Sequence, residues 1–403
     1  MDSVDAYLAE ILAQIRPLAP REMGLDDADG GVLAEDITAG CPLPPFDNSA
    51  MDGYAVRAAD TAAATADSPV ILPVAGEVAA GDTRDHQLPP GGSLRIMTGA
   101  ALPAGADAVV PVEQTDAGTD RVAISAAVAA GDAVRRAGGD AAPGDVLLTA
   151  GIRLGPAALG LLAAAGRATV LARPRPRVAV FSTGNELAVP GTPIARGRIW
   201  ESNSFMLAAA ARRAGADASR RASVPDDPGQ VLALIEEAAG RADLLVTSGG
   251  VSMGGEHDVV KAALQKLGTV RFRKVAMQPG MPQGFGVIGP AGTPILTLPG
   301  NPVSAYVSFQ LFARPVLAAL QGTADGALRT TRAVLTAPLR SPREKRSFLR
   351  GSLADDGTQV TPLSGQASHQ LATLARANAL IIVPEQVLSM QPGDVAEVIC
   401  LDG

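Results

Sequence analysis

The central part of the chain alternates between short aliphatic runs and amphipathic helical patterns. Between about residues 174 and 325, three segments share one design: residues 178–187 (VAVFSTGNEL), 243–258 (DLLVTSGGVSMGGEHD) and 295–309 (ILTLPGNPVSAYVSF). In each, an aliphatic run ends in Gly, Ser, Thr, Asn or Pro and a helical pattern follows. Strands that alternate with helices in this way predict a doubly wound, mostly parallel α/β sheet.

The flanking regions have different patterns. Residues 4–15 carry apolar side chains at helical spacing, and residues 156–165 predict a second helix. Residues 70–128 contain short strand-like runs separated by Gly, Pro and Asp, which predicts a small all-β module. The last 70 or so residues again alternate short strands and turns, which is typical of a small β barrel or sandwich.

Composition excludes several functional classes. A chain of 403 residues is too long for one core, and its net charge of −7 disfavours general affinity for nucleic acid. Two cysteines form no disulfide framework, and the acidic N-terminus does not resemble a signal peptide. The most apolar helix, residues 303–320, contains Gln310, Arg314 and Pro315, which favours a buried helix over a membrane span. We therefore expect a cytoplasmic protein with neither nucleic acid nor a membrane as partner.

The three loops that end the central strands are the candidate binding site. The carboxyl ends of parallel strands lie at one edge of a sheet, where backbone N–H groups point into a shared crevice. Glu186 and Asp258 accompany these loops, which indicates a phosphate-bearing ligand held near carboxylates, with a bridging metal as one option. The candidate binding residues are Ser182, Thr183, Gly184, Ser248, Gly249, Gly250, Ser252, Pro299, Gly300, Asn301 and Pro302.

Each motif also has a purely structural interpretation. Thr183 and Glu186 fit the Ser/Thr-x-x-Glu capping box of a helix start, and this motif alone leaves the two interpretations at even odds. Asp258 fits a simple N-cap. The loop LPGNPVS fits a rigid strand-to-helix turn in which Asn301 occupies the left-handed conformation. The convergence of three such loops favours the binding interpretation.

A fourth polar segment lies outside the α/β region. Residues 42–56 (PLPPFDNSAMDGYAV) carry Asp47, Asn48, Ser49 and Asp52 between prolines and Tyr54. From its residues alone, this segment predicts a ligand or interface loop. The three histidines, in contrast, have no spacing typical of a metal cluster.

These segments together resemble the molybdopterin molybdenumtransferase family, which includes the E domain of gephyrin. The resemblance spans essentially the whole chain. It rests on PPFDNSAMDGYAV, RIMTGAALPAGADAVV, STGNEL, SGGVS, LPGNPVS and, near the end, QASHQLATLARANALI.

The resemblance implies an enzyme of molybdenum cofactor biosynthesis that inserts molybdate into adenylylated molybdopterin and releases AMP, assisted by Mg²⁺. It implies a homodimer whose cleft is completed by the other subunit, with other proteins of the pathway as further partners. The four implied domains are residues 1–45 with 140–173 (linking and dimerisation), 46–139 (inserted β module), 174–325 (molybdopterin binding) and 326–403 (β barrel).

The resemblance also assigns roles to individual residues. Glu186, Asp258, Asp52 and Asp140 match catalytic positions, and Glu186 and Asp258 are the metal-ligand candidates. Thr98 and Asp226 join the substrate-binding residues given above. Arg350 in SFLRG and Ser368 in QASH match positions implied in molybdate binding, which agrees with the preference of oxyanions for guanidinium and hydroxyl donors.

The chain departs from the family pattern in the segment QPGMP. Gln278 and Met281 stand where lysines are usual, so two cationic donors are missing, and Arg273 and Lys274 are the neighbouring cations that could replace them. This departure supports an alternative function, a pterin-binding scaffold without efficient molybdate insertion. An adenylylating enzyme is disfavoured, because such relatives resemble mainly the α/β portion.

Overall fold

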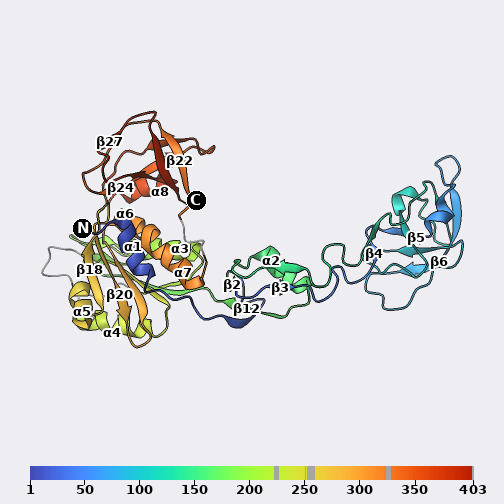
Figure 1. Ribbon diagram of the computed structural model, residues 1–403, viewed down its shortest axis with the longest axis horizontal. Helices are drawn as coiled ribbons and strands as arrows, with labels where there is room; N and C mark the ends of the chain where they lie inside the picture. Colours follow the sequence, from blue (N-terminus) through green and yellow to red (C-terminus); the bar gives the residue numbers. More distant parts are fainter. Residues whose placement is uncertain (222–226, 250, 252–258, 324–327, 402–403) are drawn as a thin grey trace.

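The computed structural model describes residues 1–221, 227–249, 251, 259–323 and 328–401. The molecule is strongly elongated (Figure 1). An α/β unit and a β barrel lie at one end together with both chain termini, a narrow linking region extends from them, and a separate β module forms the other end.

The α/β unit is built on a six-stranded sheet with the order β16-β13-β17-β21-β20-β18. The first four strands in this order are mutually parallel, whereas β20 and β18 are antiparallel to their neighbours. The predicted mostly parallel α/β sheet is therefore confirmed. The strand bounds are β13 Arg177–Ser182, β16 Asp217–Arg220, β17 Leu244–Ser248, β18 Val270–Lys274, β20 Pro282–Ile288 and β21 Thr293–Leu298.

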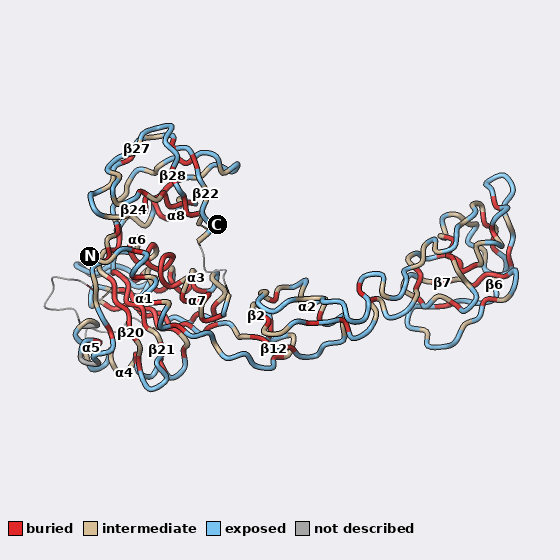
Figure 2. The backbone as a smooth tube through the Cα atoms, in the orientation of Figure 1, coloured by how far each residue is buried: buried red, intermediate tan, exposed pale blue. Residues whose placement is uncertain are grey.

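Helices cover both faces of this sheet, each with its own apolar cluster. One face packs against α3 (Asn203–Arg213), α6 (Pro302–Ser308), the π-helical segment η3 (Phe309–Ala313) and α7 (Arg314–Gln321). The other packs against α4 (Pro228–Ala239) and α5 (Val259–Leu267). Figure 2 shows the resulting buried layer along the sheet. The strands thus have hydrophobic side chains on both faces, as a parallel sheet requires.

The continuous helix Pro302–Gln321 is the one span among the described residues that is long and apolar enough to cross a membrane. Its apolar window is 78% buried inside the protein. The segment therefore serves as a core helix of the α/β unit.

The N-terminal helix α1 (Val4–Leu12) also packs on the α/β unit. Val4, Tyr7 and Ile11 are buried in the same cluster as Phe312, whose ring lies edge-on to Tyr7 at 5.1 Å. In space this helix thus packs on the α/β unit, whereas the family resemblance groups residues 1–45 with the linking region. The domain bounds stay a prediction.

The C-terminal region forms a closed barrel. β24 (Arg346–Leu353) pairs with both β25 (Gln359–Pro362) and β26 (Ala379–Val383), while β22 (Thr330–Leu335) and β28 (Val395–Cys400) close the ring. This confirms the predicted small β barrel. β19 (Met277–Gln278) leaves the α/β unit and pairs with β24. The barrel region also contains β23 (Leu339–Arg340), α8 (Leu371–Arg376) and β27 (Ser389–Met390).

The linking region and the distal module are built from short strands. The linking region contains β1 (Arg21–Gly24), β2 (Val32–Leu33), β3 (Ile37–Thr38), β11 (Val146–Leu148), α2 (Pro156–Ala164) and β12 (Thr169–Arg173). The distal module is a five-stranded sheet with the order β8-β5-β7-β6-β9, as the all-β pattern predicted. Its elements are β4 (Asn48–Ser49), β5 (Gly53–Val56), η1 (Ala58–Thr61), β6 (Val70–Val78), β7 (Ser93–Ile96), β8 (Ala108–Pro111), η2 (Val112–Gln114), β9 (Arg121–Ile124) and β10 (Val134–Arg135).

Candidate functional site

The loops that follow β13, β17 and β21 meet at one edge of the sheet. The backbone N–H of Thr183 donates to the carbonyl of Ser248 at 3.2 Å, and that of Gly249 donates to the carbonyl of Leu298 at 3.1 Å. The α-carbon of Gly249 also lies 3.5 Å from the point that a Cβ on Gly300 would occupy. After β13 the chain runs to β16, on one side of β13, and then crosses to β17, on its other side. Such a reversal of direction is a topological switch point, where open α/β sheets bind ligands.

Two glycines allow this close approach. Gly249 has a φ of +92°, and a Cβ there would lie 2.8 Å from the carbonyl oxygen of Thr183. Gly184 has a φ of +152° and lies against the carboxylate of Glu186. Gly249 therefore requires glycine for conformation and for space, and Gly184 requires it for conformation.

Glu186 does not cap a helix. The residues after it, Leu187–Ala188, form the short strand β14, which pairs with β15 (Ile199–Trp200), and the next helix begins only at Asn203. The capping-box interpretation of Thr183 and Glu186 is therefore wrong, as is the expectation that a helix directly follows this loop. Glu186 is instead an exposed carboxylate beside the loop junction.

Two polar residues of this junction were not among the candidates from the sequence. The carboxylate of Glu201, which is 6% exposed, accepts a hydrogen bond from the hydroxyl of Ser182 at 2.7 Å. The amide of Asn203 donates to the hydroxyl of Ser248 at 2.8 Å and to the carbonyl of Gly300 at 2.7 Å. The available sequence signal was the run Glu-Ser-Asn-Ser directly before an apolar helical pattern.

The third loop contacts the barrel. Asn301 is the N-cap of α6 with φ −65° and ψ 130°, so it is extended and does not adopt the left-handed conformation expected from the sequence. Its side-chain amide donates to the hydroxyl of Ser368 at 3.0 Å, and the N–H of Val303 donates to the carbonyl of Ser368 at 3.0 Å. Ser368 therefore joins the edge of the α/β site.

Arg350 lies behind the loop that carries Ser368. It is fully buried, and its Nη2 donates to the carbonyls of Gly365 at 2.5 Å and Ala367 at 3.1 Å. Its Nε and Nη1 have no acceptor among the described residues. Burial lowers the pKa of Arg350, but a guanidinium keeps its charge in proteins. A buried cation with unused donors is suited to bind an oxyanion.

The predicted residues of the linking region and the distal module lie elsewhere. Asp52 directly precedes β5, which Figure 1 places at the end opposite the α/β sheet. The backbone N–H and the hydroxyl of Thr98 both donate to the Asp52 carboxylate at 2.7 Å and hold its pKa below the ordinary value. Asp140 is exposed, and its N–H donates to the carbonyl of Leu43. A single chain thus does not bring these three residues to the α/β loops.

Four further candidates, Asp226, Gly250, Ser252 and Asp258, lie outside the described residues. Within the described part, no group of three or more His, Cys, Asp or Glu side chains is arranged to hold a metal. Arg273, a candidate replacement for the missing lysines, forms ion pairs with Asp2 at 3.0 Å and Glu10 at 2.9 Å. Its charge is therefore already compensated.

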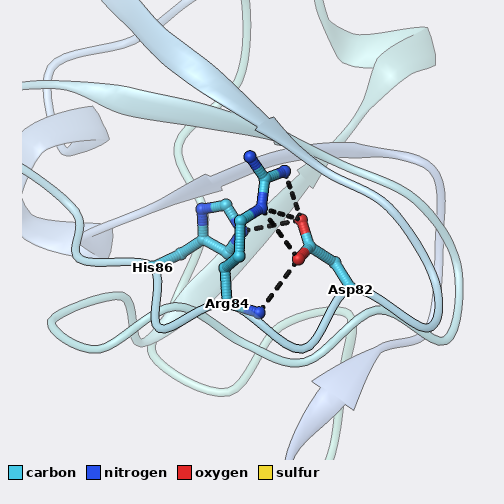
Figure 3. A network of polar contacts seen from close by, with 3 residues as sticks. All are labelled: Asp82, Arg84 and His86. Atoms are coloured by element: carbon cyan, nitrogen blue, oxygen red, sulfur yellow. Dashed lines mark hydrogen bonds and ion pairs between the residues drawn. The ribbon is translucent and has the colours of Figure 1, made fainter.

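The distal module has a polar cluster of its own (Figure 3). Asp82 accepts hydrogen bonds from the backbone N–H and the guanidinium of Arg84, and it contacts Nε2 of His86 at 2.9 Å. Arg84 is the main cause that holds the pKa of Asp82 well below its usual range. Because the backbone carbonyl of His86 also accepts from the N–H of Ala104 at 2.9 Å, this cluster fixes a loop of the module.

Comparison with known proteins relates the whole chain to one group. Residues 2–166 match the "MoeA N-terminal region (domain I and II)", residues 179–319 the "Probable molybdopterin binding domain", and residues 332–401 the "MoeA C-terminal region (domain IV)". The chain is 48% identical to molybdopterin molybdenumtransferase 2 of Mycobacterium tuberculosis, over 99% of both chains. It is 36% identical to the molybdopterin molybdenumtransferase of Bacillus subtilis, over 94% of this chain and 89% of the relative. A solved molybdopterin biosynthesis MoeA protein from Pyrococcus horikosii is 33% identical with a TM-score of 0.76, covering 100% of this chain and 99% of that one.

Proposed function

The chain belongs to the molybdopterin molybdenumtransferase family, and from this we propose that it inserts molybdate into adenylylated molybdopterin with release of AMP, in molybdenum cofactor biosynthesis. The observation that carries the proposal is the meeting of three strand ends at one edge of the molybdopterin-binding region, next to a buried arginine with unused donors. The two cysteines, both free, suit the reducing cytoplasm in which we place the protein.

The pterin nucleotide is assigned to the junction of the three loops. Glycine at positions 249 and 300 lets the three loop backbones lie close together, and Pro299 and Pro302 make the third loop rigid. Pro302 is the first residue of α6, so the amino end of a core helix also faces this edge. Ser182 donates its hydroxyl proton to Glu201 and so fixes the end of β13 beside this junction.

Molybdate is assigned to the adjoining barrel edge. Arg350 supplies the positive charge, and its Nε and Nη1 are donors without a partner among the described residues, as an oxyanion site requires. Ser368 supplies a hydroxyl on the loop that Arg350 holds, and the contact with Asn301 connects that loop to the nucleotide site. Molybdate bound here would thus lie beside the pterin.

Mg²⁺ is assigned to the carboxylate side of the junction. Protein sites for Mg²⁺ commonly use one or two carboxylates and complete the shell with water and substrate phosphates. The exposed carboxylate of Glu186 fits that pattern, whereas its expected companion, Asp258, lies outside the described residues. A bound Mg²⁺ would neutralise phosphate charge. Glu186 would hold it and orient an attacking water.

Asp52, Thr98 and Asp140 are assigned to the same reaction through a homodimer. They lie far from the α/β loops of their own chain, so a second chain has to deliver them. Exposed apolar side chains accompany both regions, with Met51 beside Asp52 and with Ile199 and Trp200 beside Glu201. We assign these side chains to the surface that the second chain covers. Other proteins of the pathway are further candidate partners.

Molybdate-dependent AMP release tests the function. Purified protein supplied with adenylylated molybdopterin, Mg²⁺ and molybdate should release AMP and retain molybdenum. Glu186→Ala should abolish release and leave the melting temperature unchanged, because Glu186 is exposed. Tight pterin binding without turnover would instead support a scaffold.

Subunit complementation tests the shared cleft. Asp52→Ala and Glu186→Ala should each be inactive as pure homodimers. Mixing the two after partial unfolding should restore part of the activity, since a mixed dimer retains one cleft with both carboxylates. A monomeric protein in sedimentation analysis, or a mixture without activity, would contradict the dimer assignment.

A further inference from the structure

A buried carboxylate organises the first loop of the site from behind. Glu201 accepts from the hydroxyl of Ser182 at 2.7 Å, and from the N–H and the hydroxyl of Ser204 at 2.7 Å and 2.6 Å. Ser182 ends β13 and Ser204 lies in the first turn of α3, so one carboxylate fixes a strand end to a helix start. Charge-assisted bonds of this kind are short and directional.

The charge of Glu201 is compensated from a neighbouring strand. Arg220 on β16 lies 3.6 Å from the Glu201 carboxylate, and its Nε donates to the hydroxyl of Ser204 at 2.9 Å. The same guanidinium lies 3.1 Å from the ring centroid of Phe205. A buried charge that is paired and hydrogen-bonded can be retained without a large penalty, so Glu201 is a stable anchor.

Asn203 ties the other two loops to the same helix start. Its Nδ2 reaches both the hydroxyl of Ser248, at the end of β17, and the carbonyl of Gly300, after β21. The Ser248 hydroxyl in turn donates to the carbonyl of Pro299 at 3.1 Å. The orientation of the amide is fixed, because its oxygen could not accept a hydrogen bond from the Gly300 carbonyl.

We propose that Glu201 and Asn203 are positioning residues, which hold the ends of β13, β17 and β21 at the spacing needed to align the pterin nucleotide for cleavage. This inference rests on the proposed function. Together these two residues make side-chain hydrogen bonds at the ends of all three strands, to Ser182, Ser248 and Gly300. Loss of these hydrogen bonds would keep every ligand-contacting group in the protein but would shift those groups relative to one another.

The separation of kcat from KM tests the proposal. Asn203→Ala removes the hydrogen bonds that tie the second and third loops to α3, and we expect kcat for AMP release to fall about 100-fold, the loss typical of a misplacement near 1 Å. KM for adenylylated molybdopterin should change little. Glu201→Gln keeps the shape of the side chain and removes its charge, and it should lower kcat in the same direction.

Asn378→Ala is the matched control. The side-chain amide of Asn378 also bonds backbone groups: it donates to the carbonyl of Leu353 at 2.8 Å and accepts from the N–H of Leu353 at 2.7 Å. Asn378 lies in the barrel, away from the three loops. Its kcat should equal that of the wild type. Melting temperatures establish that each variant is folded, and if Asn203→Ala fails to fold, Glu201→Gln carries the comparison.

Two outcomes would overturn the inference by itself. One is a folded Asn203→Ala or Glu201→Gln variant with wild-type kcat. The other is a loss of kcat/KM that arises from KM alone, which would make these residues binding groups. A wild-type protein that releases no AMP would instead overturn the proposed function, and the inference with it.

Discussion

Removing the buried guanidinium of Arg350 should abolish the stabilisation of the protein by molybdate. Without molybdate, the free energy of unfolding should change little. The substitution is Arg350→Met, which keeps the apolar length of the side chain. Nε and Nη1 are buried without acceptors among the described residues, and each such donor costs about 1–3 kcal/mol. Methionine removes that cost.

The substitution also removes favourable contacts of similar size. The bonds to the carbonyls of Gly365 and Ala367 come from a charged donor, and each is worth about 1.5–3 kcal/mol. The two sets of terms oppose each other, so we expect the free energy of unfolding to change by less than about 2 kcal/mol. Molybdate at 100 times its dissociation constant should stabilise the wild type by about 2.7 kcal/mol, and this increment should vanish in the variant.

Thermal unfolding with and without molybdate measures both quantities. Arg153→Met is the control, since Arg153 also donates to a carbonyl, that of Gly30 at 3.1 Å, but its Nη2 is satisfied by Gln321 at 2.6 Å. The control should keep the full molybdate-dependent shift. If Arg350→Met keeps the full shift, the oxyanion binds elsewhere and the assignment of Arg350 is wrong.

Three further predictions concern other parts of the site. Gln278→Lys with Met281→Lys should lower the molybdate concentration for half-maximal AMP release, because Arg273 is occupied by Asp2 and Glu10; an unchanged concentration would mean that another cation suffices. Gly249→Ala should destabilise the protein by more than about 1 kcal/mol in denaturant titrations, whereas Gly191→Ala, with a φ of +88° in open space, should cost less; equal losses would show that contact with Thr183 is unimportant. Thr98→Val should raise the pKa of Asp52 toward 3.8 in NMR titrations, because it removes the hydroxyl that donates to the carboxylate. The folded-state pKa of Asp52 is depressed, so the stability that Asp52 contributes is present above about pH 4. It is lost as the pH falls through the folded-state pKa.

The meeting of the three loops could be predicted from the sequence because it follows from the sheet. Parallel strands place their carboxyl ends at one edge, so identifying strands that end near Ser182, Ser248 and Leu298 was enough to predict that Thr183, Gly249 and Gly300 lie together. The barrel and the distal β module were likewise predicted from strand-length patterns. The spacing of apolar residues along the chain indicates which side chains are buried, and that pattern of burial distinguishes strands from helices.

The roles of Glu201 and Asn203 could not be predicted in the same way, because their partners lie far away in the sequence. Asn203 is 45 residues from Ser248 and 97 from Gly300, and no local pattern encodes such contacts. The capping-box pattern of Thr183 and Glu186 was misleading for the related reason that the parallel strand pair β14 and β15 lies before the helix, which begins only at Asn203. Thr183 and Glu186 match the capping-box sequence, but in the fold they lie in a loop between two strands and not at a helix start.

Availability of positive charge is the clearest case where tertiary structure decides chemistry. In the sequence, Arg273 and Arg350 are both arginines, and Arg273 is closer along the chain to the segment that lacks lysines. In the folded protein, Arg273 is held by two carboxylates from the N-terminal segment, so an oxyanion would have to compete with both. Within the described part of the chain, the guanidinium of Arg350 donates only to backbone carbonyls, and two of its donors are unused. We therefore expect an oxyanion to gain more at Arg350, and under the proposed function the absence of lysines at positions 278 and 281 would make molybdate binding depend more on this one residue.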